Sequence, residues 1–197
     1  MSLTLLLSFT LLSQVLFILV TVIKRRTMMT LLTPIQRFDY AFSTLCLCHR
    51  FNIPLAKISR IVSRTGDGHL YAMIGLLIWW GDQQHGDSFI LYGLLMFLIE
   101  LPLYWLLKNS FKRSRPVSLP SFIKPSDRYS LPSGHTAAAF MMAALISSFY
   151  PSCSEMVWLW ASCIGFSRVL LGVHYLSDIV AGALLGFACF ELAGFIL

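Results

Sequence analysis

Long apolar runs separated by short polar stretches dominate the 197 residues of the chain. A helix that spans a membrane needs roughly 20 apolar residues, with a range of about 17 to 25. The pattern predicts six such helices, over 3–23, 68–81, 88–107, 134–150, 156–173 and 178–197. The second run is short, so we expect it to recruit residues from its flanks. No residues remain for a separate soluble domain. The hydropathy pattern therefore predicts an all-α fold, with one membrane-embedded domain over 1–197.

The first apolar run could be mistaken for a secretory signal. No positive charge precedes it, and its basic residues, Lys24, Arg25 and Arg26, lie after the run. The run is also longer than the 7 to 15 or so apolar residues of a signal. We therefore expect a retained span rather than a cleaved signal.

The segment 24–67 mixes aromatic and apolar residues with charged ones. We interpret it as an amphipathic helix that lies in the membrane interface. A second basic turn is expected to continue it, with Lys57, Arg60 and Arg64. A seventh span at about 38–56 is the alternative, but the pair His49-Arg50 would be costly inside a bilayer.

Composition agrees with a membrane protein. Hydrophobic residues make up 57% of the chain and charged residues only 12%, whereas soluble domains average about 25% charged residues. The five cysteines are odd in number and show no CxxC spacing. Neither a disulfide framework nor a cysteine metal cluster is therefore expected.

The formal net charge is +6, which raises the possibility of a nucleic-acid ligand. The basic residues gather between the apolar runs and form no stripe interleaved with exposed aromatic side chains. We therefore expect no nucleic-acid partner. A phosphate group in a lipid headgroup is the more suitable ligand for these basic residues.

Three short polar clusters follow one another in the second half of the chain. They are Lys108 with Arg115-Pro116, then Pro132-Ser133-Gly134-His135, and last Ser167-Arg168 with His174 and Asp178. Three cations, two histidines and one carboxylate form the set needed to hold a phosphate, attack it and protonate the group that leaves. Because long apolar runs surround the clusters, the phosphate is expected to be attached to a lipid.

The middle cluster has the features of a helix start. Ser133 is placed as the N-cap, and Gly134 allows the backbone to approach a ligand closely. Unpaired N–H groups and the positive end of the helix dipole favour an anion there, and His135 would lie beside it. An ordinary capped helix without a ligand is the alternative for this cluster alone.

The last cluster suggests a nucleophile with an orienting carboxylate. His174 and Asp178 are four residues apart, so they are neighbours if the turn is helical. A carboxylate on one ring nitrogen leaves the other free to attack. A histidine that is merely hydrogen-bonded at the interface is the alternative. Arg168 favours the functional interpretation, because an arginine in an apolar segment is expensive without a counter-charge.

Lys108 and Arg115 are the remaining candidate phosphate ligands. Arginine offers a planar fork to two phosphate oxygens, and lysine offers a movable point charge. An anchoring cluster at the headgroup level is the alternative, since Lys112 and Arg113 lie between them.

Together, these residues resemble the signature of the type 2 phosphatidic acid phosphatase superfamily, whose members are also called lipid phosphate phosphatases. The matching region is 108–178, and the six-span layout extends the resemblance over most of the rest. The resemblance implies that His174 attacks phosphorus and forms a phosphohistidine, and that Asp178 orients it. It implies that His135 protonates the leaving oxygen and later activates water. The phosphoryl oxygens would be bound by Lys108, Arg115, Ser133, Gly134 and Arg168.

The resemblance also implies a reaction without a metal or another cofactor. Three cations can offset the charge that a metal would otherwise neutralise, and the aspartates of the chain are scattered along the sequence. Candidate substrates are the lipids on which short bacterial members act: undecaprenyl pyrophosphate, phosphatidylglycerol phosphate and phosphatidic acid. Headgroup specificity is expected in 24–67 and 117–131. A catalytically silent lipid-phosphate binder or transporter of the same fold is the alternative, and the oligomeric state stays open.

Two features inside the apolar runs remain. Glu100 could reach toward the site or make a structural hydrogen bond to a neighbouring helix. Gly182 and Gly186 form a small-xxx-small pair that suits close helix packing.

The expected location is a bacterial inner membrane, and two arguments about orientation conflict. In the six-span layout all fifteen Lys and Arg fall on the face that carries the three clusters. The positive-inside rule would make that face cytoplasmic. The family resemblance instead implies an outward, periplasmic site, and we favour that orientation on the resemblance alone.

Overall fold

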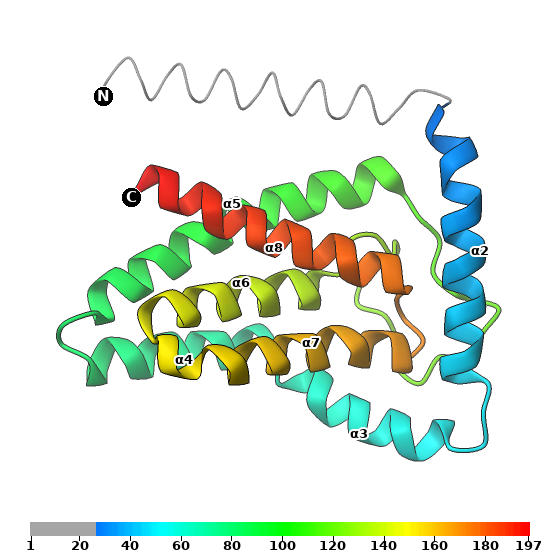
Figure 1. Cartoon of the computed structure of the whole chain (residues 1–197), viewed down its shortest axis with the longest axis horizontal. Helices are drawn as coiled ribbons and strands as arrows, with labels where there is room; N and C mark the ends of the chain where they lie inside the picture. The colour runs from blue at the N-terminus through cyan, green and yellow to red at the C-terminus, as the bar shows by residue number, and fades with distance from the viewer. Residues whose placement is uncertain (1–26) are drawn as a thin grey trace. The chain divides into compact units, whose positions relative to one another are not determined.

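The computed structural model describes residues 27–197, and within them every regular element is a helix. The predicted span over 3–23 lies outside the described residues. The helices, in chain order, are α2 (Thr27–Leu47), α3 (Asn52–Arg64), α4 (Gly68–Gly81), α5 (Gly86–Phe111), α6 (Gly134–Phe149), the short 3₁₀ helix η1 (Pro151–Cys153), α7 (Ser154–Leu170) and α8 (Leu176–Ile196). Figure 1 shows them in sequence colours. The all-α prediction is therefore confirmed for the described part of the chain.

The chain divides into two compact units, Met1–Phe38 and Asp39–Leu197. The described part of the first unit is the beginning of α2. The second unit contains the end of α2 and all the other helices, and it holds every residue of the three clusters.

The predicted spans from 68–81 onward each coincide with a helix. Two described helices, α5 and α8, are long and apolar enough to cross a membrane, and α6 is a shorter apolar helix. The six-span count and the interfacial position of 24–67 stay predictions. One boundary differs from expectation: Lys108 does not end its helix, because α5 continues to Phe111.

The segment between the first two predicted spans contains two helices rather than a helix and a turn. The chain bends at residues 48–51, so the described structure has no continuous helix over 38–56 and the seventh-span alternative is wrong. The basic residues expected in a turn lie on α3. This helix is amphipathic: Ala56, Ser59 and Ser63 are buried, whereas Lys57, Arg60 and Arg64 are exposed.

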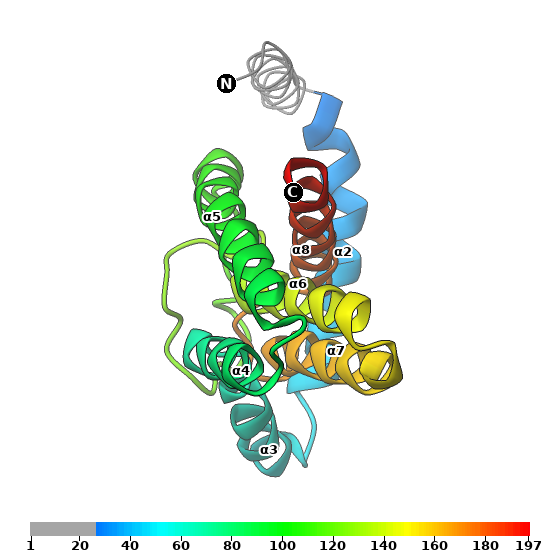
Figure 2. The same ribbon diagram turned by 90° about the vertical axis from the view of Figure 1, so that its left-hand side faces the viewer.

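Helix α6 is the centre of the second unit. Figures 1 and 2 both show it between the α5–α8 pair and α7. Small residues lie on more than one of its faces: Ala137 belongs to one core cluster, Ala139 and Ala143 belong to another, and all three are fully buried. Small side chains let neighbouring helices approach closely, and that closeness replaces the hydrophobic driving force that is weak between helices in lipid.

The two glycines of α8 make the tightest of these contacts. A Cβ added at Gly182 would lie 2.5 Å from the carbonyl oxygen of Ser133, and one at Gly186 would overlap the carbonyl oxygen of Ala137. The small-xxx-small pair therefore packs α8 against α6 within one chain. The contact at Ser133 also fixes α8 against the start of α6, where the middle cluster lies.

We expect Gly186→Ala to destabilise the protein, because the new methyl group would push α8 away from the backbone of α6. Overpacking of this kind costs roughly 1–3 kcal/mol. Thermal denaturation of the protein in detergent should show a lower Tm. The matched control is Gly75→Ala on α4, where an added Cβ meets nothing within 4 Å. Equal Tm values for Gly186→Ala and the wild type would contradict the tight α6–α8 contact.

Candidate active site

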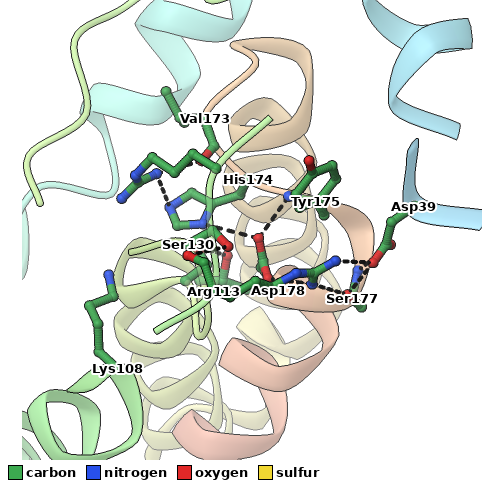
Figure 3. Close-up of polar contacts among 12 residues, drawn as sticks. Asp39, Lys108, Arg113, Ser130, Val173, His174, Tyr175, Ser177 and Asp178 are labelled. Atoms are coloured by element: carbon green, nitrogen blue, oxygen red, sulfur yellow. Dashed lines mark hydrogen bonds and ion pairs between the residues drawn. The ribbon is translucent and has the colours of Figure 1, made fainter. Parts of the chain in front are cut away.

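His174 and Asp178 lie where the chain passes from α7 into α8. Tyr175 is the N-cap of α8, and the Oδ2 atom of Asp178 accepts a hydrogen bond of 2.8 Å from the Tyr175 backbone N–H. The Nδ1 atom of His174 is 3.7 Å from the same oxygen, as Figure 3 shows. The two side chains are therefore neighbours, but His174 precedes the helix instead of lying one helical turn before Asp178. Within the described structure, the buried Nδ1 atom has no hydrogen-bond partner.

The environment of His174 favours a neutral ring. The side chain is only 3% exposed, and burial lowers the pKa of His174 below its ordinary value despite the opposing effect of Asp178. Its Nε2 atom is 3.5 Å from the Nη1 atom of Arg115. A neutral imidazole keeps a lone pair, which an attack on phosphorus requires, and a cation beside that nitrogen can attract the phosphate it would attack.

Asp178 has hydrogen-bond partners besides its neighbour His174. Its Oδ1 atom accepts a hydrogen bond of 2.7 Å from Arg113, and the same guanidinium reaches Asp39 of α2 at 2.7 Å. The hydroxyl of Ser177 also donates to Asp39. Figure 3 shows Arg113 between the two carboxylates. No signal in the sequence singles out Arg113, which is only one member of a basic run.

Lys108 and Arg115 meet at a carboxylate that was not predicted as a site residue. The Nζ atom of Lys108 is 2.7 Å from the Oδ2 atom of Asp127, which also accepts a 2.6 Å hydrogen bond from the hydroxyl of Tyr104. Arg115 donates to the other carboxylate oxygen, Oδ1. Burial raises the pKa of Asp127, but the hydrogen bonds from Lys108 and Tyr104 outweigh it and lower the pKa to about 2. Asp127 is therefore ionised, and it offsets the cost of burying both cations.

The middle cluster begins α6 as predicted. Ser133 is the N-cap, although its side chain makes no capping hydrogen bond and instead accepts one of 2.9 Å from the hydroxyl of Thr136. The backbone N–H of Ser133 donates to the carbonyl of Asp178 at 3.1 Å, which ties this cluster to the last one. A Cβ added at Gly134 would lie 3.0 Å from the ring of Tyr104, so only glycine fits here without displacing that ring.

His135 and Arg168 share a cavity. The Nε2 atom of His135 is 3.1 Å from the Oδ1 atom of Asp67, the N-cap residue of α4. The Nη1 atom of Arg168 donates to Ser63 at 2.6 Å, and its buried Nε atom has no partner in the described structure. Both side chains line a cavity of about 550 Å³. Arg168 is only 4% exposed and its Nε–H donor is unpaired among the described residues, so this side chain is suited to bind an anion.

Four of the aspartates that are scattered along the sequence, Asp39, Asp67, Asp127 and Asp178, are each placed against a cation or a histidine. Asp178 and Asp39 share Arg113, Asp127 joins Lys108 to Arg115, and Asp67 faces His135. Glu100 is buried in α5 at 4% exposure. Among the described residues there is no group of three His, Cys, Asp or Glu that could hold a metal ion.

A family model described as the PAP2 superfamily matches residues 88–193, more than half of the chain and all three clusters. The chain belongs to the PAP2 superfamily. The predicted resemblance is therefore confirmed.

Three curated relatives align with part of the chain. It is 30% identical over 124 residues to the bacitracin transport permease protein BcrC of Bacillus licheniformis, covering 59% of this chain and 60% of that protein. It is 33% identical over 131 residues to a probable lipid phosphate phosphatase beta of Arabidopsis thaliana, covering 50% and 61%. It is 36% identical over 114 residues to phosphatidylglycerophosphatase B of Bacillus subtilis, covering 51% and 55%. The chain thus spans between 55% and 61% of the length of these relatives.

Two solved structures share the fold. LpxE of Aquifex aeolicus superposes with a TM-score of 0.69 at 24% identity, covering 79% of this chain and 93% of that one. A transmembrane PAP2-type phosphatidylglycerolphosphate phosphatase of Bacillus subtilis superposes with a TM-score of 0.66 at 22% identity, covering 94% of each chain. The helical arrangement described above is therefore shared with these two structures.

We expect Arg113→Gln to destabilise the protein, because it would leave the buried carboxylates of Asp39 and Asp178 facing each other without a cation. Removing one partner from a buried ion pair costs about 3–5 kcal/mol. Thermal denaturation in detergent measures the loss. The exposed neighbour Lys112 supplies the matched control, Lys112→Gln, which should keep the wild-type Tm.

A double variant tests the cause. Adding Asp39→Asn to Arg113→Gln removes one of the two facing charges and should recover part of the lost stability. If the double variant is less stable than Arg113→Gln, Arg113 does not act by balancing these carboxylates.

Proposed function

We propose that this protein is a membrane phosphatase that removes the terminal phosphate from a lipid phosphate or pyrophosphate. The single observation that carries the proposal is the buried His174 with Arg115 at one ring nitrogen and Asp178 near the other. A neutral imidazole between a cation and a carboxylate suits a nucleophile that attacks an anion. Membership of the PAP2 superfamily and the names of two curated relatives support the same reaction class.

In the proposed first step the Nε2 atom of His174 attacks phosphorus and forms a phosphohistidine. The bond from phosphorus to the bridging oxygen breaks, and that oxygen takes its electron pair and a proton from His135. Asp178 stabilises the positive charge that develops on the His174 ring, which shortens the present 3.7 Å separation to a hydrogen bond.

The cations would hold the phosphoryl oxygens through this step. Lys108 and Arg115 are held by Asp127, so the incoming phosphoryl group must replace that carboxylate. A phosphate offers more charge and more acceptor oxygens than a carboxylate does, so the exchange is favourable. Arg168 adds its free Nε donor, and Ser133 and Gly134 add the start of α6.

In the proposed second step His135, now neutral, takes a proton from water. The resulting hydroxide attacks the phosphohistidine, the P–N bond breaks, and inorganic phosphate leaves. Asp67, which faces the Nε2 atom of His135, would stabilise the protonated ring at both stages. The same side chains thus serve as acid and base in turn.

The competing function is a lipid-phosphate carrier without catalysis, because the curated name of one relative describes a transport permease. Release of inorganic phosphate from lipid substrates by the purified protein separates the two. A panel of undecaprenyl pyrophosphate, phosphatidylglycerol phosphate and phosphatidic acid also ranks the substrates. No phosphate release from any lipid of the panel would refute the proposed function.

We expect turnover to survive EDTA and to be inhibited by vanadate, which mimics pentacoordinate phosphorus. The physical reason is that the cations Lys108, Arg115 and Arg168 take the part that a metal would otherwise play. Phosphate release is measured with and without each reagent. Loss of activity on chelation that magnesium restores would contradict this mechanism.

We expect His174→Ala to abolish turnover, because no other side chain is proposed to attack phosphorus. His135→Ala should be severe, but less so for a pyrophosphate, whose leaving group needs less help from an acid. Asp178→Asn should leave a trace of activity, because it disturbs orientation more than chemistry. Full activity of His174→Ala would refute the assignment of the nucleophile.

A further inference from the structure

A polar cavity of about 550 Å³ lies beside the proposed acid, His135. The end of α3, the N-cap of α4 and the loop at 122–126 close it around His135 and Arg168. Its charged lining residues are Arg60, Arg64, Asp67, Lys124, His135 and Arg168. Residues 60–67 and 122–126, which belong to the two segments in which specificity was expected, therefore meet at one cavity.

His135 identifies what the cavity would hold. The proposed acid must face the oxygen that bridges phosphorus to the leaving group. His135 lines the cavity, so the part of the substrate beyond that bridging oxygen would lie there. The transferred phosphoryl group would lie between the proposed nucleophile, His174, and Arg168, which also lines the cavity.

The charges of the residues that line the cavity indicate the chemistry of the part of the substrate beyond the bridging oxygen. Arg60, Arg64 and Lys124 are exposed cations outside the proposed phosphoryl-binding set. The carboxylate of Asp67 is the opposing charge, and it is directed to His135. The guanidinium of Arg60 donates to the carbonyl of Phe122, which ties α3 to the loop that carries Lys124.

A neutral alcohol as leaving group would gain little from three additional cations. A second phosphate would gain charge-assisted hydrogen bonds from each of them. Lys57 provides a contrast, because it is an exposed cation of the same helix that does not line the cavity. Of the three exposed cations of α3, only Arg60 and Arg64 therefore line the cavity.

We infer that Arg60, Arg64 and Lys124 form a subsite for a second phosphate on the leaving-group side of the scissile bond. The inference rests on the proposed phosphatase function and narrows its substrate class. The preferred lipids carry two phosphates, either as a diphosphate or as a terminal phosphate near a phosphodiester. Phosphatidic acid, which has one phosphate, leaves the subsite without a ligand.

The test compares kcat/KM for three lipids: a polyprenyl diphosphate, phosphatidylglycerol phosphate and phosphatidic acid. In the double variant Arg64→Gln, Lys124→Gln we expect the preference for a two-phosphate lipid over phosphatidic acid to fall about tenfold or more, as loss of charge-assisted hydrogen bonds predicts. The matched control Lys57→Gln should keep the wild-type preference. Arg60 is left intact because it also holds the loop.

The outcomes separate this inference from the proposed function. Wild-type protein that hydrolyses none of the lipids refutes the phosphatase. Wild-type activity with the same proportional change for all three lipids in the double variant refutes the subsite alone. Loss of preference for the diphosphate but not for phosphatidylglycerol phosphate assigns the subsite to a phosphate bonded directly to the one transferred. The reverse pattern assigns it to a phosphodiester farther along the headgroup.

Discussion

Asp178 is fully buried in the first turn of α8, and a buried carboxylate is tolerable only where donors and cations surround it. The N–H of Tyr175 and the guanidinium of Arg113 donate to it, and the ring of His174 lies 3.7 Å away. The same guanidinium also pairs with Asp39 of α2. The backbone carbonyl of Asp178 accepts from Ser133 at the start of α6. One residue therefore connects α2, the loop after α5, α6 and α8. Because each of these contacts is made inside the protein, none can be exchanged for water without a large cost.

The same electrostatics apply to the cations that we propose to bind phosphate. Lys108 and Arg115 are buried, and the Asp127 carboxylate stands between them. A carboxylate and a phosphate both offer oxygens to the same donors, so Lys108 and Arg115 are already arranged around an anion. Such preorganisation is what makes electrostatic stabilisation effective in catalysis, because the protein need not reorient its charges during the reaction. Arg168 differs, since it keeps a buried donor without a partner.

The close packing of α6 against α8 explains how such a small bundle holds these groups at fixed distances. Gly182 brings the backbone of α8 against the carbonyl of Ser133, only four residues after Asp178. The start of α6 and the start of α8 are thus held together by a steric contact and a hydrogen bond. PAP2 membership and the similarity to transmembrane PAP2 structures accord with this helical frame. Much of the lining of the cavity beside His135 comes instead from α3 and the loop after α5, which lie outside that packing.

The sequence by itself determined the helices and the residues of the motif. Apolar runs and a serine at the N-cap position are local signals, so α4 and the start of α6 agree with prediction to within a residue or two. Fixed spacing was enough to select Lys108, Arg115, His135 and His174 as candidates. The tertiary structure alone decided which carboxylate faces which cation. Arg113 meets Asp39 from 74 residues away, and His135 meets Asp67 from 68. No local pattern encodes such pairs, because they arise only when packed helices bring distant segments together. For the same reason the basic residues of α3 read as a turn in the sequence, whereas burial of Ala56, Ser59 and Ser63 against the bundle makes them one face of a helix.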